Sequence, residues 1–175
     1  GVGGFAVQMG RLLDLDTITT CSGVNFLAVK DLGADHSIDY RCEDVTVRIM
    51  EITNGRGVDI AINTIDSDSA SEDMNRLAFG GHLACVAGLP DFNRIEPFTR
   101  AISIHESALG GAHLSEDRVA QSDLAEMGKE LMKLVQDGKI MTMLSKLVSL
   151  EEIPQALTDL SRRHVSGKIV ARLDD

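Results

Sequence analysis

The sequence opens with the stretch GVGGFAVQMGRLL, residues 1–13, in which glycines lead directly into a helical pattern. Val2, Phe5, Met9 and Leu12 recur every three or four positions, as on one face of an α-helix. A glycine-rich loop that runs into a helix can bind phosphate, because the backbone is accessible and the helix N-terminus offers free N–H groups. Most such runs are ordinary turns, so the rest of the chain decides the meaning of this one.

Downstream of this stretch, short β-branched or apolar runs alternate with helical patterns. We expect strands over residues 17–21, 37–40, 58–64, 82–87, 102–109 and 168–171, and helices over residues 26–32, 44–53, 69–77 and 124–138. Ser149 and Glu152 have the spacing of a capping box, with Ser149 as the N-cap of a further helix. This alternation predicts an α/β fold, a Rossmann-like doubly wound parallel sheet with helices on both faces.

Composition excludes several classes of protein. At 175 residues with 43% hydrophobic residues, the chain has the size of one domain. The net charge of −10 argues against binding to nucleic acid or to an anionic membrane surface. No apolar run reaches the ~18 residues of a spanning helix, and no signal peptide is evident. We therefore expect a cytoplasmic protein.

The chain shows no metal-binding or disulfide pattern. Cys21, Cys42 and Cys85 are odd in number and form no C-x-x-C pair, so we interpret them as small buried hydrophobes. His105-Glu106 begins like a metalloprotease helix motif, but the second histidine would have to stand where Leu109 is. We predict no metal ligand and no catalytic residue in this chain.

Taken together, the segments resemble the nucleotide-binding half of the medium-chain dehydrogenase/reductase superfamily, which includes zinc alcohol dehydrogenases and NADPH:quinone oxidoreductases. The matching segments are Gly1-Val2-Gly3-Gly4-Phe5-Ala6-Val7-Gln8, Leu32-Gly33-Ala34-Asp35, Ile38-Asp39-Tyr40, Asn54-Gly55-Arg56-Gly57-Val58-Asp59, Gly80-Gly81-His82-Leu83 and Gly167-Lys168-Ile169-Val170. Their order and spacing along the whole chain are more specific than any one of them.

The resemblance implies that Gly1, Val2 and Gly3 are the last three positions of the family's pyrophosphate-binding glycine pattern. It also implies that the first strand and the earlier glycine are absent from this sequence. That strand lies at the centre of the family's sheet. Its neighbours must then close up, leave a gap, or accept a strand from elsewhere, and the sequence does not choose among these.

The residues after the second strand of that fold bear on the choice between NAD and NADP. NAD enzymes place an acidic residue about 20 positions after the glycines, where it binds the ribose 2′-hydroxyl. Ser22 stands 19 positions after Gly3, and Ser22 and Asn25 can donate hydrogen bonds to a 2′-phosphate. The resemblance adds Tyr40 to this group. We predict NADPH as the cofactor, with NADH as the alternative if Ser22 and Asn25 merely cap a helix; no lysine or arginine stands beside Ser22.

The resemblance also implies that the ends of two later strands border the nicotinamide. These positions are Thr64, Ile65, Ala87, Gly88 and Leu89. Carboxyl ends of parallel strands are where open α/β sheets bind ligands. For Thr64, a purely structural role at the strand end is the alternative.

We expect residues 1–142 to form the dinucleotide-binding domain and residues 143–175 to be a segment that returns to an absent catalytic domain. The resemblance places substrate binding, and any zinc, in that absent domain, so we expect the chain alone to bind a dinucleotide weakly and to catalyse nothing. The predicted function is NADPH-dependent reduction of a quinone or enone, a small-molecule substrate. The alternatives are a zinc-dependent alcohol dehydrogenase and a non-enzymatic dinucleotide-binding module. We also expect a homodimer, joined through the edge strand from Ile102 to Leu109.

Overall fold

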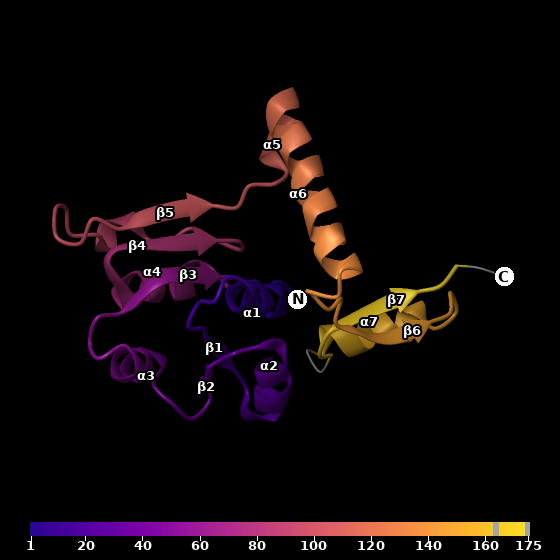
Figure 1. Cartoon of the computed structure of the whole chain (residues 1–175), viewed down its shortest axis with the longest axis horizontal. Helices are drawn as coiled ribbons and strands as arrows, with labels where there is room; N and C mark the ends of the chain where they lie inside the picture. Colours follow the sequence, from indigo (N-terminus) through magenta and orange to yellow (C-terminus); the bar gives the residue numbers. More distant parts are fainter. Residues whose placement is uncertain (163–164, 174–175) are drawn as a thin grey trace.

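The computed structural model describes residues 1–162 and 165–173, and the strands within these ranges form three separate sheets (Figure 1). β1 (Ile18–Cys21) pairs with β2 (His36–Asp39). β3 (Val58–Asn63), β4 (Leu77–Cys85) and β5 (Ser103–Glu106) form a second sheet in that order. β6 (Leu144–Val148) pairs with β7 (Lys168–Ala171). All of these pairs are parallel, which confirms the predicted parallel α/β fold.

The first unit is built around β1 and β2, with β2 buried through Ile38. α1 (Val2–Leu12) packs against α2 (Phe26–Leu32), which in turn packs on β2. Gly33 ends α2 in the left-handed conformation, with φ of 108°, as its position after the helix predicts. Asp44 caps α3 (Val45–Ile52) by accepting two backbone N–H groups, which confirms that prediction.

The second unit packs α4 (Ser67–Arg76) on one face of the sheet formed by β3, β4 and β5. Its core consists of Ala70, Met74, Leu77, Leu83 and Cys85. Strand residues alternate between the two faces of a sheet, so Ile60 and Ile62 lie on the face opposite Ala61. Both isoleucines are about half exposed, at 57% and 49%. This face of β3 is therefore only partly covered by the described residues.

The two units do not share a sheet. In the described part of the chain no ladder joins β1 to β3, so these strands neither close up nor accept another strand between them. A ladder requires neighbouring strands about 4.8 Å apart. Of the three arrangements that the sequence left open, the described structure has the gap between β1 and β3.

Two predicted boundaries are wrong. β4 begins at Leu77 and runs through Gly80 and Gly81, which had been expected to separate a helix from a strand starting at His82. Gly80 has a φ of +75°, and a Cβ on Gly81 would lie 3.0 Å from the Ala78 carbonyl, so these glycines make an irregular strand rather than end a helix.

The second wrong boundary concerns the helix expected from Ser149. α7 (Ile153–Ser161) begins after Glu152, which is its N-cap. Half of the capping box still forms, because the Glu152 carboxylate accepts the backbone N–H of Ser149 at 2.8 Å. β6 was not expected.

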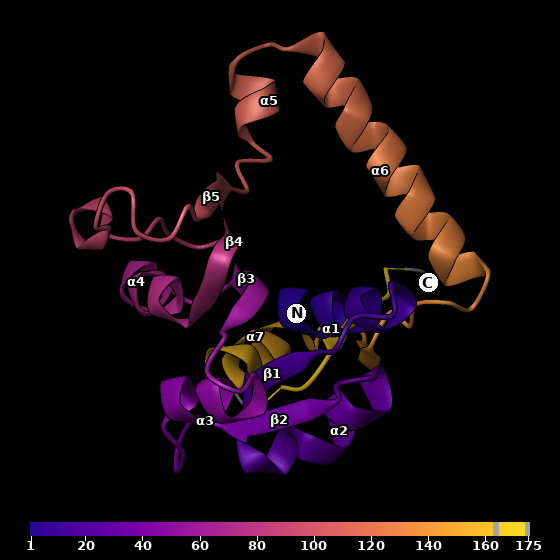
Figure 2. The same cartoon turned by 60° about the vertical axis from the view of Figure 1, so that its left-hand side comes forward.

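The 3-10 helix η2 (Phe92–Arg94) lies in the connection between β4 and β5. After β5, the short helix α5 (Gly111–Leu114) precedes the long helix α6 (Arg118–Gln136). Figures 1 and 2 show α6 extending away from the sheets. The helix is confirmed, but its apolar stripe, predicted to face inward along Leu124, Met127, Leu131, Leu134 and Val135, has no buried residue. Met127 and Leu131 are about half exposed, since no sheet lies beneath the helix.

Gln8 of α1 is hydrogen-bonded to the chain just before the C-terminal unit. Gln8 is 5% exposed, and its amide both accepts the Met141 N–H at 2.7 Å and donates to the Met141 carbonyl at 3.2 Å. The domain boundary expected at residues 142/143 stays a prediction. Among the described helices, none is long and apolar enough to cross a membrane.

Candidate cofactor site

The candidate site lies where α1 begins and where the strands of the first two sheets end. Figure 1 shows the arrowheads of β3, β4 and β5 pointing toward the side on which the N-terminus lies. This is the edge at which open parallel sheets bind ligands. The predicted site residues come from three places along it: the start of α1, the ends of β1 and β2, and the ends of β3 and β4.

The start of α1 is suited to an anion. Gly1 is the N-cap and the helix begins at Val2, so Gly3 lies in the first turn and not in a preceding loop. A Cβ built on Gly1 or on Gly3 would meet no atom within 4 Å, and the first turn carries no acidic residue. The unpaired N–H groups of a helix start, open to approach and without a repelling carboxylate, fit the pyrophosphate of a dinucleotide.

Gly4 has a different role from the other glycines of the run. A Cβ on Gly4 would come within 2.5 Å of the Met143 sulfur. Its missing side chain therefore lets the C-terminal segment pack closely on α1, and it is not part of the open surface.

At the end of β1, Ser22 and Asn25 are brought together. Ser22 is 7% exposed, and the Asn25 amide donates to its hydroxyl oxygen at 3.2 Å. The two residues flank η1 (Gly23–Asn25), as Ser22 is its N-cap without a side-chain cap bond. Neither predicted role, phosphate binding or capping, is tested by this arrangement, although the pair does lie at the expected strand end.

Asp39, which no sequence pattern singled out as a site residue, also lies at this point. Cys21 pairs with Asp39 across the ladder, and the Asp39 carboxylate accepts the N–H of Gly23 at 2.8 Å and the N–H of Arg41 at 3.0 Å. The Arg41 N–H bond is the main cause that holds the pKa of Asp39 below its ordinary value, with smaller contributions from the Cys42 thiol and the Gly23 N–H. An ionised carboxylate thus lies next to Ser22, supplied by the neighbouring strand.

Tyr40 and Arg41 follow β2 on the same edge. Tyr40 is 54% exposed, and the Arg41 guanidinium carbon lies 5.9 Å from the centre of its ring. This is a cation–π distance. Tyr40 therefore follows the end of β2 with a cation beside it, and its predicted contact with the cofactor stays a prediction.

The loop after β3 is held by a buried polar network centred on Asn63, which was read only as the end of a strand. Asn63 is 3% exposed; its amide donates to Ser69 at 2.9 Å and to Asp73 at 2.7 Å, and its carbonyl accepts the Ile65 N–H at 3.0 Å. Asn63 therefore fixes the backbone that carries Thr64 and Ile65, both of which are exposed as predicted ligands would need to be.

The three residues after β4 that were predicted to border the nicotinamide differ in exposure and packing. Ala87 is exposed, whereas Leu89 packs against the hydrophobic core and presents only backbone to the site. A Cβ on Gly88 would lie 2.6 Å from the Ser67 hydroxyl, so this glycine is needed for contact with the start of α4. Whether any of the three binds nicotinamide stays a prediction.

The cysteines were predicted to be buried, and that is right only for Cys85. Cys21 is partly exposed and Cys42 is exposed; the hydrogen bond that the Cys42 thiol donates to Asp39 is the main cause that raises its pKa. No group of three or more His, Cys, Asp or Glu side chains within residues 1–162 and 165–173 is placed to hold a metal ion.

Comparison with known proteins matches this geometry to one family. The model of a zinc-binding dehydrogenase family matches residues 32–170. A trans-enoyl reductase from Alternaria alternata is 30% identical over 98% of this chain, and a quinone oxidoreductase from Pseudomonas aeruginosa is 26% identical over 97%. An alcohol dehydrogenase superfamily protein from Novosphingobium aromaticivorans superposes with a TM-score of 0.83, at 24% identity over 99% of the chain. The chain spans about half of each of these proteins, from 52% to 53% of their lengths.

Proposed function

This chain belongs to the zinc-binding dehydrogenase family, within the medium-chain dehydrogenase/reductase superfamily, and we propose that it forms the cofactor-binding part of an NADPH-dependent reductase of quinones or enones. Two relatives support this class, since one is named a trans-enoyl reductase and the other a quinone oxidoreductase. In such a reaction the nicotinamide supplies the hydride, and the protein binds and orients the dinucleotide.

One observation carries the proposal: an open helix start and polar strand ends lie along one edge of the fold. The N–H groups at Gly1 and Gly3 would hold the pyrophosphate. Ser22, Asn25 and Tyr40 would hold the 2′-phosphate, and the loop fixed by Asn63 would border the nicotinamide. Among the proposed ligands of the 2′-phosphate, Tyr40 is exposed, whereas Ser22 is buried and already accepts the Asn25 amide, so a bound phosphate would have to rearrange this pair.

The choice of NADPH depends on how Asp39 is used. A carboxylate that is free to accept a ribose 2′-hydroxyl favours NAD. Asp39 already accepts two backbone N–H groups, from Gly23 and Arg41. Its carboxylate is therefore occupied in holding the two turns together and is not free to accept a ribose hydroxyl. Ser22, at the position counted from the glycines, is not an acid.

Titration of the full chain with NADPH and with NADH, followed by nicotinamide fluorescence, tests the proposal. NADPH should bind roughly tenfold more tightly, the effect of about one charge-assisted hydrogen bond. Ser22→Ala should reduce that preference, while Ser115→Ala, on an exposed serine of another unit, should not. Tighter binding of NADH by the unmodified chain would refute the cofactor choice. No turnover is expected in these titrations, because no catalytic residue is assigned to the chain.

A zinc-dependent alcohol dehydrogenase is the second candidate, favoured by the description of the matched family and by the superposed alcohol dehydrogenase superfamily protein. The two candidates differ in the domain that would carry the substrate. A protein that joins this chain to such a domain should reduce a quinone or enone in the presence of EDTA; loss of activity with EDTA, together with oxidation of an alcohol, would favour the zinc enzyme.

We also propose a homodimer that extends the sheet through β5. β5 is the last strand in the order β3-β4-β5, as predicted, and its outer edge has backbone groups able to pair with a second copy. Sedimentation equilibrium would contradict the dimer if the chain were monomeric at micromolar concentration. A cytoplasmic location stays a prediction.

A further inference from the structure

A 2′-phosphate needs a positive charge, and the fold brings one to the candidate site from outside the segment around Ser22. β1 and β2 end at the same level, with Cys21 opposite Asp39. The next residues of both strands therefore emerge side by side. The Asp39 carboxylate joins the two turns, because one oxygen accepts the Gly23 N–H at 2.8 Å and the other accepts the Arg41 N–H at 3.0 Å. The backbone of Arg41 is thus linked through the Asp39 carboxylate to the turn that begins at Ser22.

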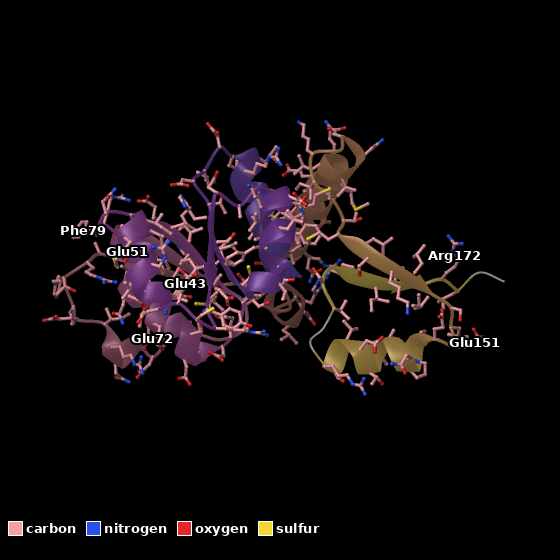
Figure 3. The ribbon with its side chains drawn as sticks, turned by 90° about the horizontal axis from the view of Figure 1, so that it is seen from below. Glu43, Glu51, Glu72, Phe79, Glu151 and Arg172 are labelled. Atoms are coloured by element: carbon pink, nitrogen blue, oxygen red, sulfur yellow. The ribbon has the colours of Figure 1, made fainter. Side chains whose placement is uncertain are left out.

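The guanidinium of Arg41 is available to a ligand. Arg41 is exposed and lies over the Tyr40 ring, and among the ion pairs found in the described ranges none includes it. Arg48, the next arginine in the chain, is paired with Glu43 at 3.0 Å and with Glu51, and both glutamates are labelled in Figure 3. Arg48 is therefore paired with neighbouring carboxylates, whereas no ion pair in the described ranges includes Arg41.

The electrostatics of the two strand ends require such a charge. Asp39 is ionised, and a 2′-phosphate placed near Ser22 would bring a charge of about −1.5 to −2 close to it. Hydrogen bonds from Ser22 and Asn25 are neutral and do not offset that repulsion. A guanidinium offers a planar pair of N–H donors that match phosphate oxygens, and stacking on an aromatic ring restricts its motion.

We propose that Arg41 is the residue that selects NADPH. Its guanidinium binds the ribose 2′-phosphate, while its backbone N–H donates to the Asp39 carboxylate. This inference rests on the proposed function, since it names a specificity residue of the same cofactor site. Removal of the guanidinium leaves Asp39 as the dominant charge, so the site should then lose its preference for the phosphorylated nucleotide.

The test uses the adenosine half of the cofactor, so that only the 2′-phosphate differs between the two probes. Isothermal titration of the full chain with adenosine 2′,5′-bisphosphate and with adenosine 5′-monophosphate gives two dissociation constants. In Arg41→Gln, the affinity for the bisphosphate should fall about tenfold while the affinity for the monophosphate is unchanged. Arg41→Lys should fall less, because it keeps the charge but not the two-pronged donor. Arg56→Gln, which removes an exposed arginine paired with Asp59 elsewhere, should change neither constant.

Three results of these titrations would contradict the proposed role of Arg41. If the unmodified chain prefers the bisphosphate and Arg41→Gln keeps that preference, Arg41 is not the selecting residue, although the proposed cofactor stands. An equal loss for both probes would show that Arg41 only supports the local fold, and this also overturns the inference. If the unmodified chain binds the two probes equally, the choice of NADPH itself fails, and the role of Arg41 fails with it.

Discussion

Gln8 should be the residue on which docking of the C-terminal unit depends. Its side chain is buried on α1 and makes two hydrogen bonds to the backbone of Met141, a residue 133 positions away. Gln8→Ala removes both bonds and leaves the Met141 N–H and carbonyl to find other partners. A typical hydrogen bond contributes about 1 kcal/mol net, so we expect the free energy of unfolding to fall by about 2 kcal/mol.

Urea denaturation followed by circular dichroism measures this change. With a slope of about 2 kcal/mol per molar urea, the midpoint should fall by about 1 M. Gln155→Ala is the matched control, because Gln155 is exposed on α7 and makes one bond, to Asp159; its effect should stay within about 0.5 kcal/mol.

Trypsin provides a local measurement of the same contact. Lys139 is exposed just before the segment that Gln8 holds, so opening of that segment should expose the bond after Lys139. Cleavage there should be faster in Gln8→Ala than in Gln155→Ala. An unchanged midpoint together with an unchanged cleavage rate would refute the view that Gln8 joins the two units.

Two other predictions concern the core and the acid response. Leu83→Ala, at a fully buried core position, should cost about 2–5 kcal/mol in urea denaturation, whereas Leu131→Ala, on the uncovered stripe of α6, should cost less than about 0.5; equal costs would mean that α6 packs on the body of the protein in solution. Because the pKa of Asp39 is lowered in the folded state, its ionised form should stabilise the fold above the ordinary aspartate value of about 3.9, and that contribution should disappear as pH falls through the lower folded-state pKa. The difference in stability between the unmodified chain and Asp39→Asn should therefore shrink in acid, and a pH-independent difference would contradict this.

Local signals in the sequence predicted the elements well. Asp44 as a cap, Gly33 after α2, and the apolar run of β3 each depend on a few neighbouring residues, and each is found as expected. The predicted start of β4 at His82 was wrong, because Gly80 and Gly81 fit an irregularity within a strand as well as a break between elements.

The carboxyl edge of the strands was also predictable in outline, because parallel strands bring their ends together whatever the side chains are. Ser22, Tyr40, Thr64 and Ala87 all lie after the ends of strands, as the alternation of elements implies. Asn63 could have been suspected as a polar residue at the end of a mostly apolar strand. Its two side-chain donor bonds go to Ser69 and Asp73 of α4, so they depend on how that helix packs.

By itself, the sequence determined the kind of protein: the order of strands and helices, the parallel α/β class and the family resemblance follow from periodicity, glycine positions and motif spacing. Only the tertiary structure decided that the sheet is divided between β1 and β3, that the stripe of α6 is uncovered, and that Asp39 joins the turn after Ser22 to the backbone of Arg41. These depend on contacts between segments far apart in the chain. Arg41 illustrates the reason. No lysine or arginine stands beside Ser22 in the sequence, whereas the pairing of β1 with β2 brings the strand end that precedes Arg41, 19 positions further along the chain, next to the end of β1.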